Sequence, residues 1–399
     1  MKKLLFIFLT ISTLGVGQIY QTGTITLTFN DPARTGGFGS GAGPGRQIQT
    51  EVYYPSTISG SNVAVASGTF PVVVIGHGFV MDWNSYDNIY SMLSKRGYIV
   101  ALPRTEGGFS PSHSEFGLDL ALVANKITQL NVTNTVAPIF VGKVDSRVAL
   151  SGHSMGGGSS FLGAKSNSSI TCLFNFAAAQ TNPTSSQAAK QVTVPTLIIG
   201  GQSDCVAPPA TNQDKMWDST ASSKKYEIII KSLTHCDFGN GTNFNCVFGQ
   251  SSTGCSSTVS NATALQLYMN FVNPFLDFNL KGICTEGTRF MDSLNLSQVI
   301  FNKKQLGVLG CLATSVGSIQ SQDILSAFPN PTDGIVYLKF PNEETWNVEL
   351  FSALGLKLDS EILPYEEGVK INMEKFAKGI YFIKVSDKNQ SYTKKILKY

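Results

Sequence analysis

The stretch Gly152-His153-Ser154-Met155-Gly156 constrains the fold of this chain more than any other, because glycines stand two positions before and after a serine. The apolar residues 148–150 indicate a buried strand before it, and the small and apolar residues after it indicate a helix. Such a turn forces a strained backbone on the serine and leaves no room for side chains two positions away. The pattern predicts a sharp strand-to-helix turn that exposes the Ser154 hydroxyl as a nucleophile.

Strands and helices alternate on both sides of this turn. A β-branched run without polar alternation, which is typical of a parallel sheet covered on both faces, occupies residues 70–76. Further strands are expected at residues 98–102, 170–176, 196–199 and 225–230. Helical patterns occupy residues 85–94, 114–130 and 261–278, and residues 24–29 and 47–54 suit an antiparallel opening. Alternation with short connections predicts right-handed crossovers in a doubly wound, mostly parallel α/β sheet.

The two ends of the chain differ from this middle. Residues 1–17 combine a basic start, an apolar stretch and small residues, which predicts a secretory signal peptide and leaves residues 18–312 as the catalytic domain. Residues 313–325 are rich in Ser, Thr, Gly and Gln and suit a linker, and short alternating strands within residues 326–399 predict a small all-β sandwich. No run after the signal peptide is long enough to span a membrane, and a net charge of +3 without a basic cluster argues against a nucleic-acid partner. We expect an exported monomer.

A serine becomes a nucleophile when a histidine takes its proton and a carboxylate holds that histidine in the right tautomer. His235 follows the strand 225–230, and Asp204 follows the strand 196–199, so both belong at the carboxyl edge of the sheet. We therefore predict Ser154, Asp204 and His235 as a catalytic triad. The alternatives fit less well: His153 points away from its neighbour, His77 and His113 occupy other loops, and Asp214 and Asp218 fall on a solvent-facing helix.

Ester cleavage develops a negatively charged oxygen that needs two backbone donors. The amide after the nucleophile belongs to Met155, and the loop after the first buried strand offers the amide of Phe79. The Phe79 ring can also form a wall for an apolar acyl group. Trp83, Phe109 and Phe238 are candidates for the same cleft, or they are ordinary core or rim aromatics. This chemistry needs no metal and no organic cofactor.

Export allows the seven cysteines to form disulfides, and the odd count leaves one over. Cys172 lies within an apolar strand and is expected to be the free thiol. Cys205 and Cys236 directly follow the acid and the base, so contact between Asp204 and His235 would bring them together. By proximity the other pairs would be Cys246 with Cys255 and Cys284 with Cys311, although the sequence permits further connectivities.

The same residues resemble the serine hydrolases of the α/β type, in particular the cutinase-like, polyester-cleaving branch that includes PET hydrolases. The matching stretches are Gly152–Gly158, residues 195–208 around Asp204, and Thr234-His235. Over residues 20–312 the resemblance implies the same triad and the same donors, Phe79 and Met155. Two positions depart from the family pattern: Phe79 replaces a tyrosine, and residues 179–182 replace a tryptophan of the substrate cleft, with Thr181 the nearest match.

The last part of the chain resembles the C-terminal sorting domain of type IX secretion substrates. The matching stretches are residues 328–332, 348–351, 379–385 and 394–396, in that order. The resemblance implies export across a double-membrane envelope, a partnership with the type IX secretion machinery, and a secreted or cell-surface location.

Together these features predict a secreted serine carboxylester hydrolase for hydrophobic esters, plausibly polyesters such as PET, that works through an acyl-enzyme. Trp83, Phe79 and Thr181 are its expected substrate contacts. The alternatives are a lipase or short-chain esterase without polymer activity, and a non-catalytic cell-surface binding protein.

Overall fold

The computed structural model describes residues 20–132, 134–165, 167–311, 325–340, 346–353, 356–366, 368–386 and 391–399. The chain divides into two compact units, Met1–Cys311 and Leu312–Tyr399. The expected signal peptide and nearly all of the expected linker lie outside the described residues. Leu325, the last residue of that linker, is buried in the core of the second unit. No helix among the described residues is long and apolar enough to cross a membrane.

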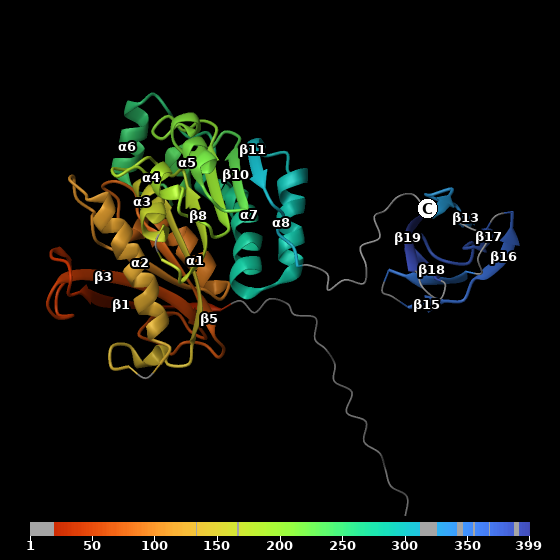
Figure 1. Cartoon of the computed structure of the whole chain (residues 1–399), viewed down its shortest axis with the longest axis horizontal. Coiled ribbons are helices and arrows are strands. Elements are labelled where there is room, and N and C mark those ends of the chain that lie inside the picture. Colours follow the sequence, from red (N-terminus) through yellow and green to blue (C-terminus); the bar gives the residue numbers. More distant parts are fainter. Residues whose placement is uncertain are drawn as a thin grey trace, which may run out of the picture. The chain divides into compact units, whose positions relative to one another are not determined.

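The first unit is built on one large sheet whose middle is parallel (Figure 1). Its strands follow the order β11-β10-β9-β8-β7-β5-β6-β3-β1-β4, and β2 (Gly37–Phe38) pairs with β3. Neighbours from β10 to β6 are parallel, whereas β11, β3 and β1 join antiparallel. The strands are β1 (Gln21–Asp31), β3 (Arg46–Ser56), β4 (Gly60–Ser61), β5 (Phe70–Gly76), β6 (Ile99–Pro103), β7 (Val144–His153), β8 (Ile170–Phe176), β9 (Thr196–Gly201), β10 (Lys225–Ile230) and β11 (Ile300–Leu306).

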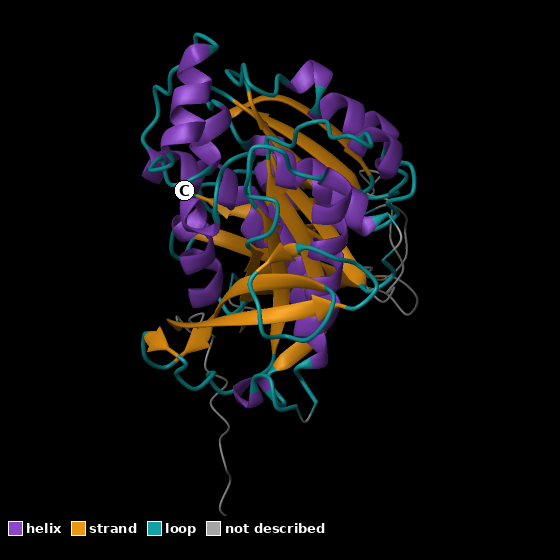
Figure 2. Cartoon of the chain, turned by 90° about the vertical axis from the view of Figure 1, so that its left-hand side faces the viewer, coloured by secondary structure: helices purple, strands orange, loops and turns teal. Residues whose placement is uncertain are grey.

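Helices cover both faces of this sheet, as the turned view in Figure 2 shows. Along β5, Val72 and Val74 face one core while Val73 and Ile75 face the other, because successive side chains of a strand point to opposite faces. The first core is closed by α2 (His113–Gln129), α3 (Met155–Ala164), α4 (Ser185–Ala189) and α5 (Gln213–Ser219). The second is closed by α1 (Asp87–Lys95), α7 (Asn261–Lys281) and α8 (Cys284–Leu296). Burial of both strand faces explains why the central strands read as continuous apolar runs.

The second unit consists of two antiparallel sheets that share one core. One sheet has the order β12-β13-β17-β16 and the other β15-β14-β18-β19. Val336, Ile371 and Ile383 lie in the shared core. The strands are β12 (Ser326–Phe328), β13 (Ile335–Lys339), β14 (Asn347–Ser352), β15 (Lys357–Leu358), β16 (Glu361–Tyr365), β17 (Gly368–Asn372), β18 (Gly379–Ser386) and β19 (Ser391–Lys398).

The fold class expected from the sequence, a mostly parallel α/β-hydrolase sheet followed by a small β-sandwich, is confirmed. The elements of the first unit that were not foreseen include α6 (Phe244–Ser252), α8 and the edge strand β11. The sequence of α6 is rich in Asn, Gly and Ser, residues that favour turns over helices. Its helix begins because the Asn243 side chain accepts a hydrogen bond from the Cys246 amide.

Candidate active site

Ser154 lies where β7 ends and α3 begins, with a backbone φ of 54°. That value belongs to the left-handed region, which non-glycine residues adopt at a cost in strain. The surrounding backbone leaves no space for side chains: a Cβ on Gly152 would lie 2.3 Å from the carbonyl carbon of Gly156, and a Cβ on Gly156 would lie 2.3 Å from Gly76. The glycines of the motif are therefore steric requirements of this turn.

Asp204 and His235 are hydrogen-bonded, with 2.7 Å between Asp204 Oδ2 and His235 Nδ1, and both side chains are buried. The other carboxylate oxygen, Oδ1, accepts the backbone N–H groups of Val206 at 2.9 Å and Ala207 at 2.8 Å. Because Nδ1 donates to the carboxylate, Nε2 is the proton-accepting nitrogen of the neutral ring. Asp204 follows β9, and His235 begins a short 3-10 helix (His235–Phe238) after β10, so both stand at the carboxyl edge of the sheet.

His153 connects Ser154 to the base loop. Its Nε2 lies 2.9 Å from the backbone oxygen of His235, and its ring centroid lies 4.8 Å from that of His235. The described contacts include no direct hydrogen bond between Ser154 and His235; in free enzymes such bonds are often loose and tighten with substrate. Burial first, and then the nearby His235, lower the pKa of His153 well below its ordinary value. His153 is therefore a neutral structural link.

Tyr86 extends this link to the loop that carries Phe79. A carbonyl oxygen only accepts, so Nε2 of His153 donates to His235, and Nδ1 accepts from the Tyr86 hydroxyl at 3.0 Å. The same hydroxyl accepts the Gly78 N–H at 2.9 Å. One buried chain of hydrogen bonds thus ties together the loops of Phe79, Ser154 and His235, and nothing in the sequence pattern revealed it.

The two expected backbone donors belong to a helix start and to a loop. Met155 is the first residue of α3, where backbone N–H groups have no partner within the helix. Phe79 follows Gly78 in the loop after β5, and its side chain is 50% exposed. The next residue, Val80, has a φ of 52° and accepts a hydrogen bond from Asn245 of α6 at 3.0 Å. The loop is therefore held from one side by Tyr86 and from the other by α6.

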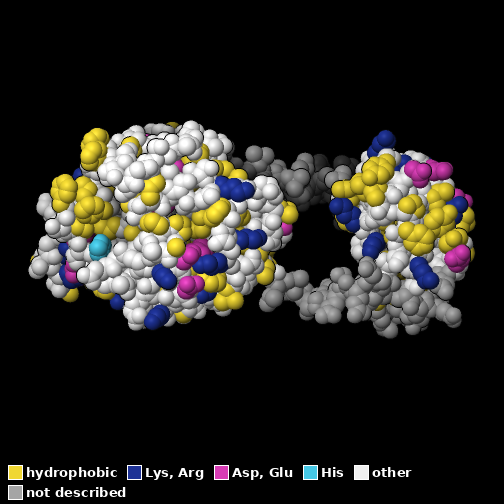
Figure 3. Space-filling view, turned by 90° about the horizontal axis from the view of Figure 1, so that it is seen from above, with side chains coloured by type: hydrophobic (Ala, Val, Ile, Leu, Met, Phe, Trp, Pro, Cys, Tyr) yellow, Lys and Arg dark blue, Asp and Glu magenta, His cyan; other side chains and the backbone are white. Residues whose placement is uncertain are grey.

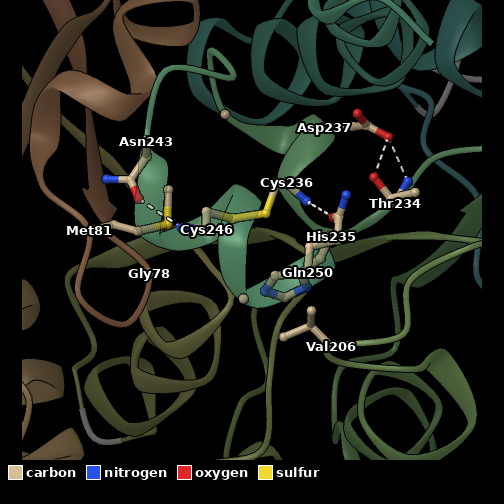
Figure 4. Close-up of a disulfide and its surroundings, with 12 residues drawn as sticks. Gly78, Met81, Val206, Thr234, His235, Cys236, Asp237, Asn243, Cys246 and Gln250 are labelled. Carbon is tan, nitrogen blue, oxygen red and sulfur yellow. Dashed lines mark hydrogen bonds between the residues drawn. A yellow bond between two sulfur atoms is a disulfide. The ribbon is translucent and has the colours of Figure 1, made fainter. Parts of the chain in front are cut away.

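The six cysteines expected in disulfides all form them, but two of the expected pairings are wrong. Cys205 pairs with Cys255, and Cys236 pairs with Cys246, in place of Cys205–Cys236 and Cys246–Cys255. The reason is α6, which lies against the base loop with Cys246 in its first turn (Figure 4). Cys255 follows three residues after the end of α6. Each loop cysteine therefore reaches the α6 segment and not the other loop.

The remaining cysteines behave as expected. Cys284 pairs with Cys311, and Cys172 is free and buried. Burial raises the pKa of the Cys172 thiol, which keeps it protonated and unreactive.

The base loop has further support that the sequence did not reveal. Asp237 Oδ2 accepts hydrogen bonds from the Thr234 amide and hydroxyl, both at 2.7 Å, which closes the turn that carries His235 (Figure 4). From α6, the side-chain oxygen of Gln250 accepts the Cys236 amide at 2.8 Å. A threonine three residues before an acid is a capping pattern that could have indicated the first of these contacts.

The residues expected in the substrate cleft differ from one another in burial and in contacts. Phe238 is fully buried and packs against Phe176 and Tyr268, so it belongs to the core. The guanidinium of Arg104 lies over the ring of Trp83, with 3.9 Å between Arg104 Cζ and the ring centroid. Thr181 is buried, and its hydroxyl donates to the carbonyl of Pro183 at 2.7 Å. Phe109 is highly exposed.

A hollow of about 1120 Å³ lies at the opposite edge of the sheet, where β5 and β7 begin. Phe70, Asp145 and Lys281 are among the residues that line it. Several of the charges there are paired, since Arg147 binds Asp145 and both Arg96 and Lys281 bind Asp277. It shares no residue with the Ser154, Asp204 and His235 loops, so the chemistry assigned to those loops does not extend to it.

Comparison with known proteins gives two family matches. The family described as PET hydrolase-like matches residues 20–252, and the secretion system C-terminal sorting domain matches residues 326–399. The second match places the protein among secreted or cell-surface proteins.

Two curated proteins are similar to the first unit. A bis(hydroxyethyl) terephthalate hydrolase of Streptomyces coelicolor is 26% identical over 243 residues, which are 60% of this chain and 63% of the relative. A cutinase, est1, of Thermobifida alba is 23% identical over 217 residues, which are 54% of this chain and 64% of the relative. The chain thus spans a little under two thirds of the length of each.

Proposed function

Because the chain belongs to the PET hydrolase-like family, we propose that it is a secreted serine carboxylester hydrolase acting on hydrophobic esters through Ser154, His235 and Asp204. The observation that carries the proposal is the 2.7 Å hydrogen bond between buried Asp204 and His235. The strained Ser154 is close to this pair, because the preceding residue, His153, contacts His235. A buried acid–histidine pair beside a strained serine is the arrangement that activates a serine hydroxyl.

In the proposed mechanism the Ser154 oxygen attacks the ester carbonyl while His235 Nε2 takes its proton. The amides of Phe79 and Met155 donate hydrogen bonds to the oxygen that becomes negatively charged. His235 then gives the proton to the leaving alcohol, which departs and leaves an acyl group on Ser154. A water molecule repeats the sequence, with its proton passing to His235, and releases the acid. Asp204 stabilises the charged ring in both halves.

Aromatic polyesters are the proposed substrate class. The support is the family itself and the names of the two relatives, a bis(hydroxyethyl) terephthalate hydrolase and a cutinase. The proposed alternative is a short-chain esterase without polymer activity, which is favoured by the engaged hydroxyl and burial of Thr181 where the family has a tryptophan. Comparing product release from PET film and from p-nitrophenyl butyrate distinguishes the two.

The first test replaces the nucleophile. Ser154→Ala is expected to lower kcat/KM for p-nitrophenyl butyrate by about 10⁴-fold or more, since removal of a triad member leaves only the residual catalysis of the site. Ser159→Ala is the matched control, because Ser159 lies on the same helix, is buried, and has no hydrogen-bond partner among the described residues. Equal activity of Ser154→Ala and the wild type would remove the proposed mechanism.

For the second unit we propose that the type IX secretion machinery recognises residues 326–399. The support is the match to the sorting domain together with a core that the unit forms by itself.

A further inference from the structure

Two exposed phenylalanines stand side by side on α6. Phe244 and Phe248 are 74% and 63% exposed, and their rings are stacked with centroids 5.6 Å apart and planes 18° from parallel. They are four residues apart and therefore share one face of the helix, with exposed Val247 beside them. We call Phe244, Val247 and Phe248 the α6 aromatic face. Exposed apolar side chains that are contiguous, unlike ones scattered singly, mark interaction sites.

The segment that carries the α6 aromatic face is fixed to the loops of Phe79, Asp204 and His235. The disulfide of Cys246 reaches the residue after His235, and the disulfide of Cys255 reaches the residue after Asp204. Asn245 donates a hydrogen bond to the backbone of Val80, the residue after Phe79. A molecule or surface that binds to the α6 aromatic face is therefore held beside the loop of Phe79, the proposed oxyanion donor.

The chemistry of the surroundings limits what that body can be. Residues 238–276 contain no Asp, Glu, Lys or Arg, so a charged partner would find no complementary charge on this segment. Phe79 and Val206, at the loops of the triad, are also exposed. Figure 3 shows hydrophobic side chains gathered at the left of the first unit, the side on which Figure 1 places α6.

We propose that the α6 aromatic face adsorbs the enzyme to the uncharged surface of an aromatic polyester and thereby presents ester bonds to the rim beside Phe79. Aromatic rings of the polymer can stack on Phe244 and Phe248, which are already parallel to each other. A small soluble ester reaches the triad without touching this face. The inference rests on the proposed esterase function and adds to it a separate step, attachment to the solid.

The test separates attachment from chemistry. Phe244→Ala/Phe248→Ala, made in a Ser154→Ala background, is expected to weaken adsorption to amorphous PET particles about tenfold or more, because two large apolar side chains would no longer leave water on contact with the polymer. In the catalytically intact protein the same double variant is expected to change kcat/KM for p-nitrophenyl butyrate less than twofold and to lower product release from the particles at low enzyme concentration.

Phe301→Ala is the matched control, because Phe301 is 57% exposed on the edge strand β11. Phe301→Ala in the Ser154→Ala background is expected to adsorb to PET like Ser154→Ala alone. Neither of these two proteins is expected to bind cellulose, an uncharged but polar polymer. Unchanged adsorption of the double variant overturns the inference while leaving the esterase proposal intact. So does a dimer that the double variant converts to a monomer, since the face would then bind a second copy. The esterase proposal is tested separately. It requires that Ser154→Ala loses p-nitrophenyl butyrate hydrolysis and that the catalytically intact double variant keeps it.

Discussion

Glu227 is a buried carboxylate on β10 with an unusual environment. Its side chain is fully buried, and its nearest cation is Lys304, at 3.1 Å from Oε2. Lys304 also binds Asp214 at 2.9 Å, so one cation is shared by two acids. Burial first and the charge of Asp214 second raise the pKa of Glu227 to about 8, against the opposing effect of Lys304.

This shift predicts that the fold loses stability as the pH rises. A group whose pKa is raised on folding contributes its full stability below its unfolded pKa, here 4.5, and loses it as the pH rises toward about 8. Glu227→Gln is expected to match the wild type near pH 5 and to exceed it near pH 9, by at most about 5 kcal/mol of unfolding free energy. Denaturant titrations from pH 5 to 9 measure the difference. Asp218→Asn, at an exposed carboxylate near the same lysine, is the control; identical slopes for Glu227→Gln and the wild type would contradict the prediction.

At the scale of residues, local geometry was predictable where backbone sterics and chain order determine it. The spacing around Ser154 requires glycines, and the structure shows the close approaches that explain this. Asp204 and His235 could be chosen because each follows a buried strand. Phe238 was a candidate for the cleft and lies in the core instead, because its burial depends on Phe176 and Tyr268, which are distant in sequence. Local pattern contains no information about such contacts.

At the scale of elements, α6 explains most of what the sequence did not reveal. The helix depends on a capping side chain and two disulfides more than on helix propensity, so its Asn- and Ser-rich sequence reads as a loop. Without α6, the cysteines after Asp204 and His235 look like partners for each other. With α6 present, both loops are still joined, but through the helix between them.

The two disulfides are expected to contribute differently to the free energy of unfolding. Cys205–Cys255 closes a segment of 50 residues and Cys236–Cys246 one of 10, so the chain-entropy model assigns them about 4 and about 2.7 kcal/mol. Replacing Cys205 and Cys255 by alanine is expected to lower the unfolding free energy more than replacing Cys236 and Cys246, as guanidinium titration measures. A digest without reductant should yield both linked peptide pairs. A peptide joining Cys205 to Cys236, or the reverse order of stabilities, would contradict this account.

At the scale of the whole molecule, alternation of strands and helices was enough to predict a parallel sheet covered on both faces. The edge strand β11 was not predicted, because it is mostly exposed and lacks the apolar run of the central strands. It also pairs antiparallel with β10 and follows two helices, which departs from the strand–helix alternation. The second unit was predictable as a sandwich because its strands alternate. Its shortest strands, β12 with three residues and β15 with two, are too short to give a pattern.

The two units are expected to serve catalysis and export separately. Each has its own core, and the PET hydrolase-like match ends well before residue 326. Removing residues 326–399 is therefore expected to leave kcat/KM for p-nitrophenyl butyrate within about twofold of the full chain and to leave the melting temperature of the first unit unchanged. Removing residues 311–399 is the control, because it also takes Cys311 from Cys284 and is expected to lower that temperature. In a host with type IX secretion, the chain without residues 326–399 should remain inside the outer membrane. Activity lost with residues 326–399 would mean that the hydrolase depends on its tail, and export without them would show that another segment directs secretion.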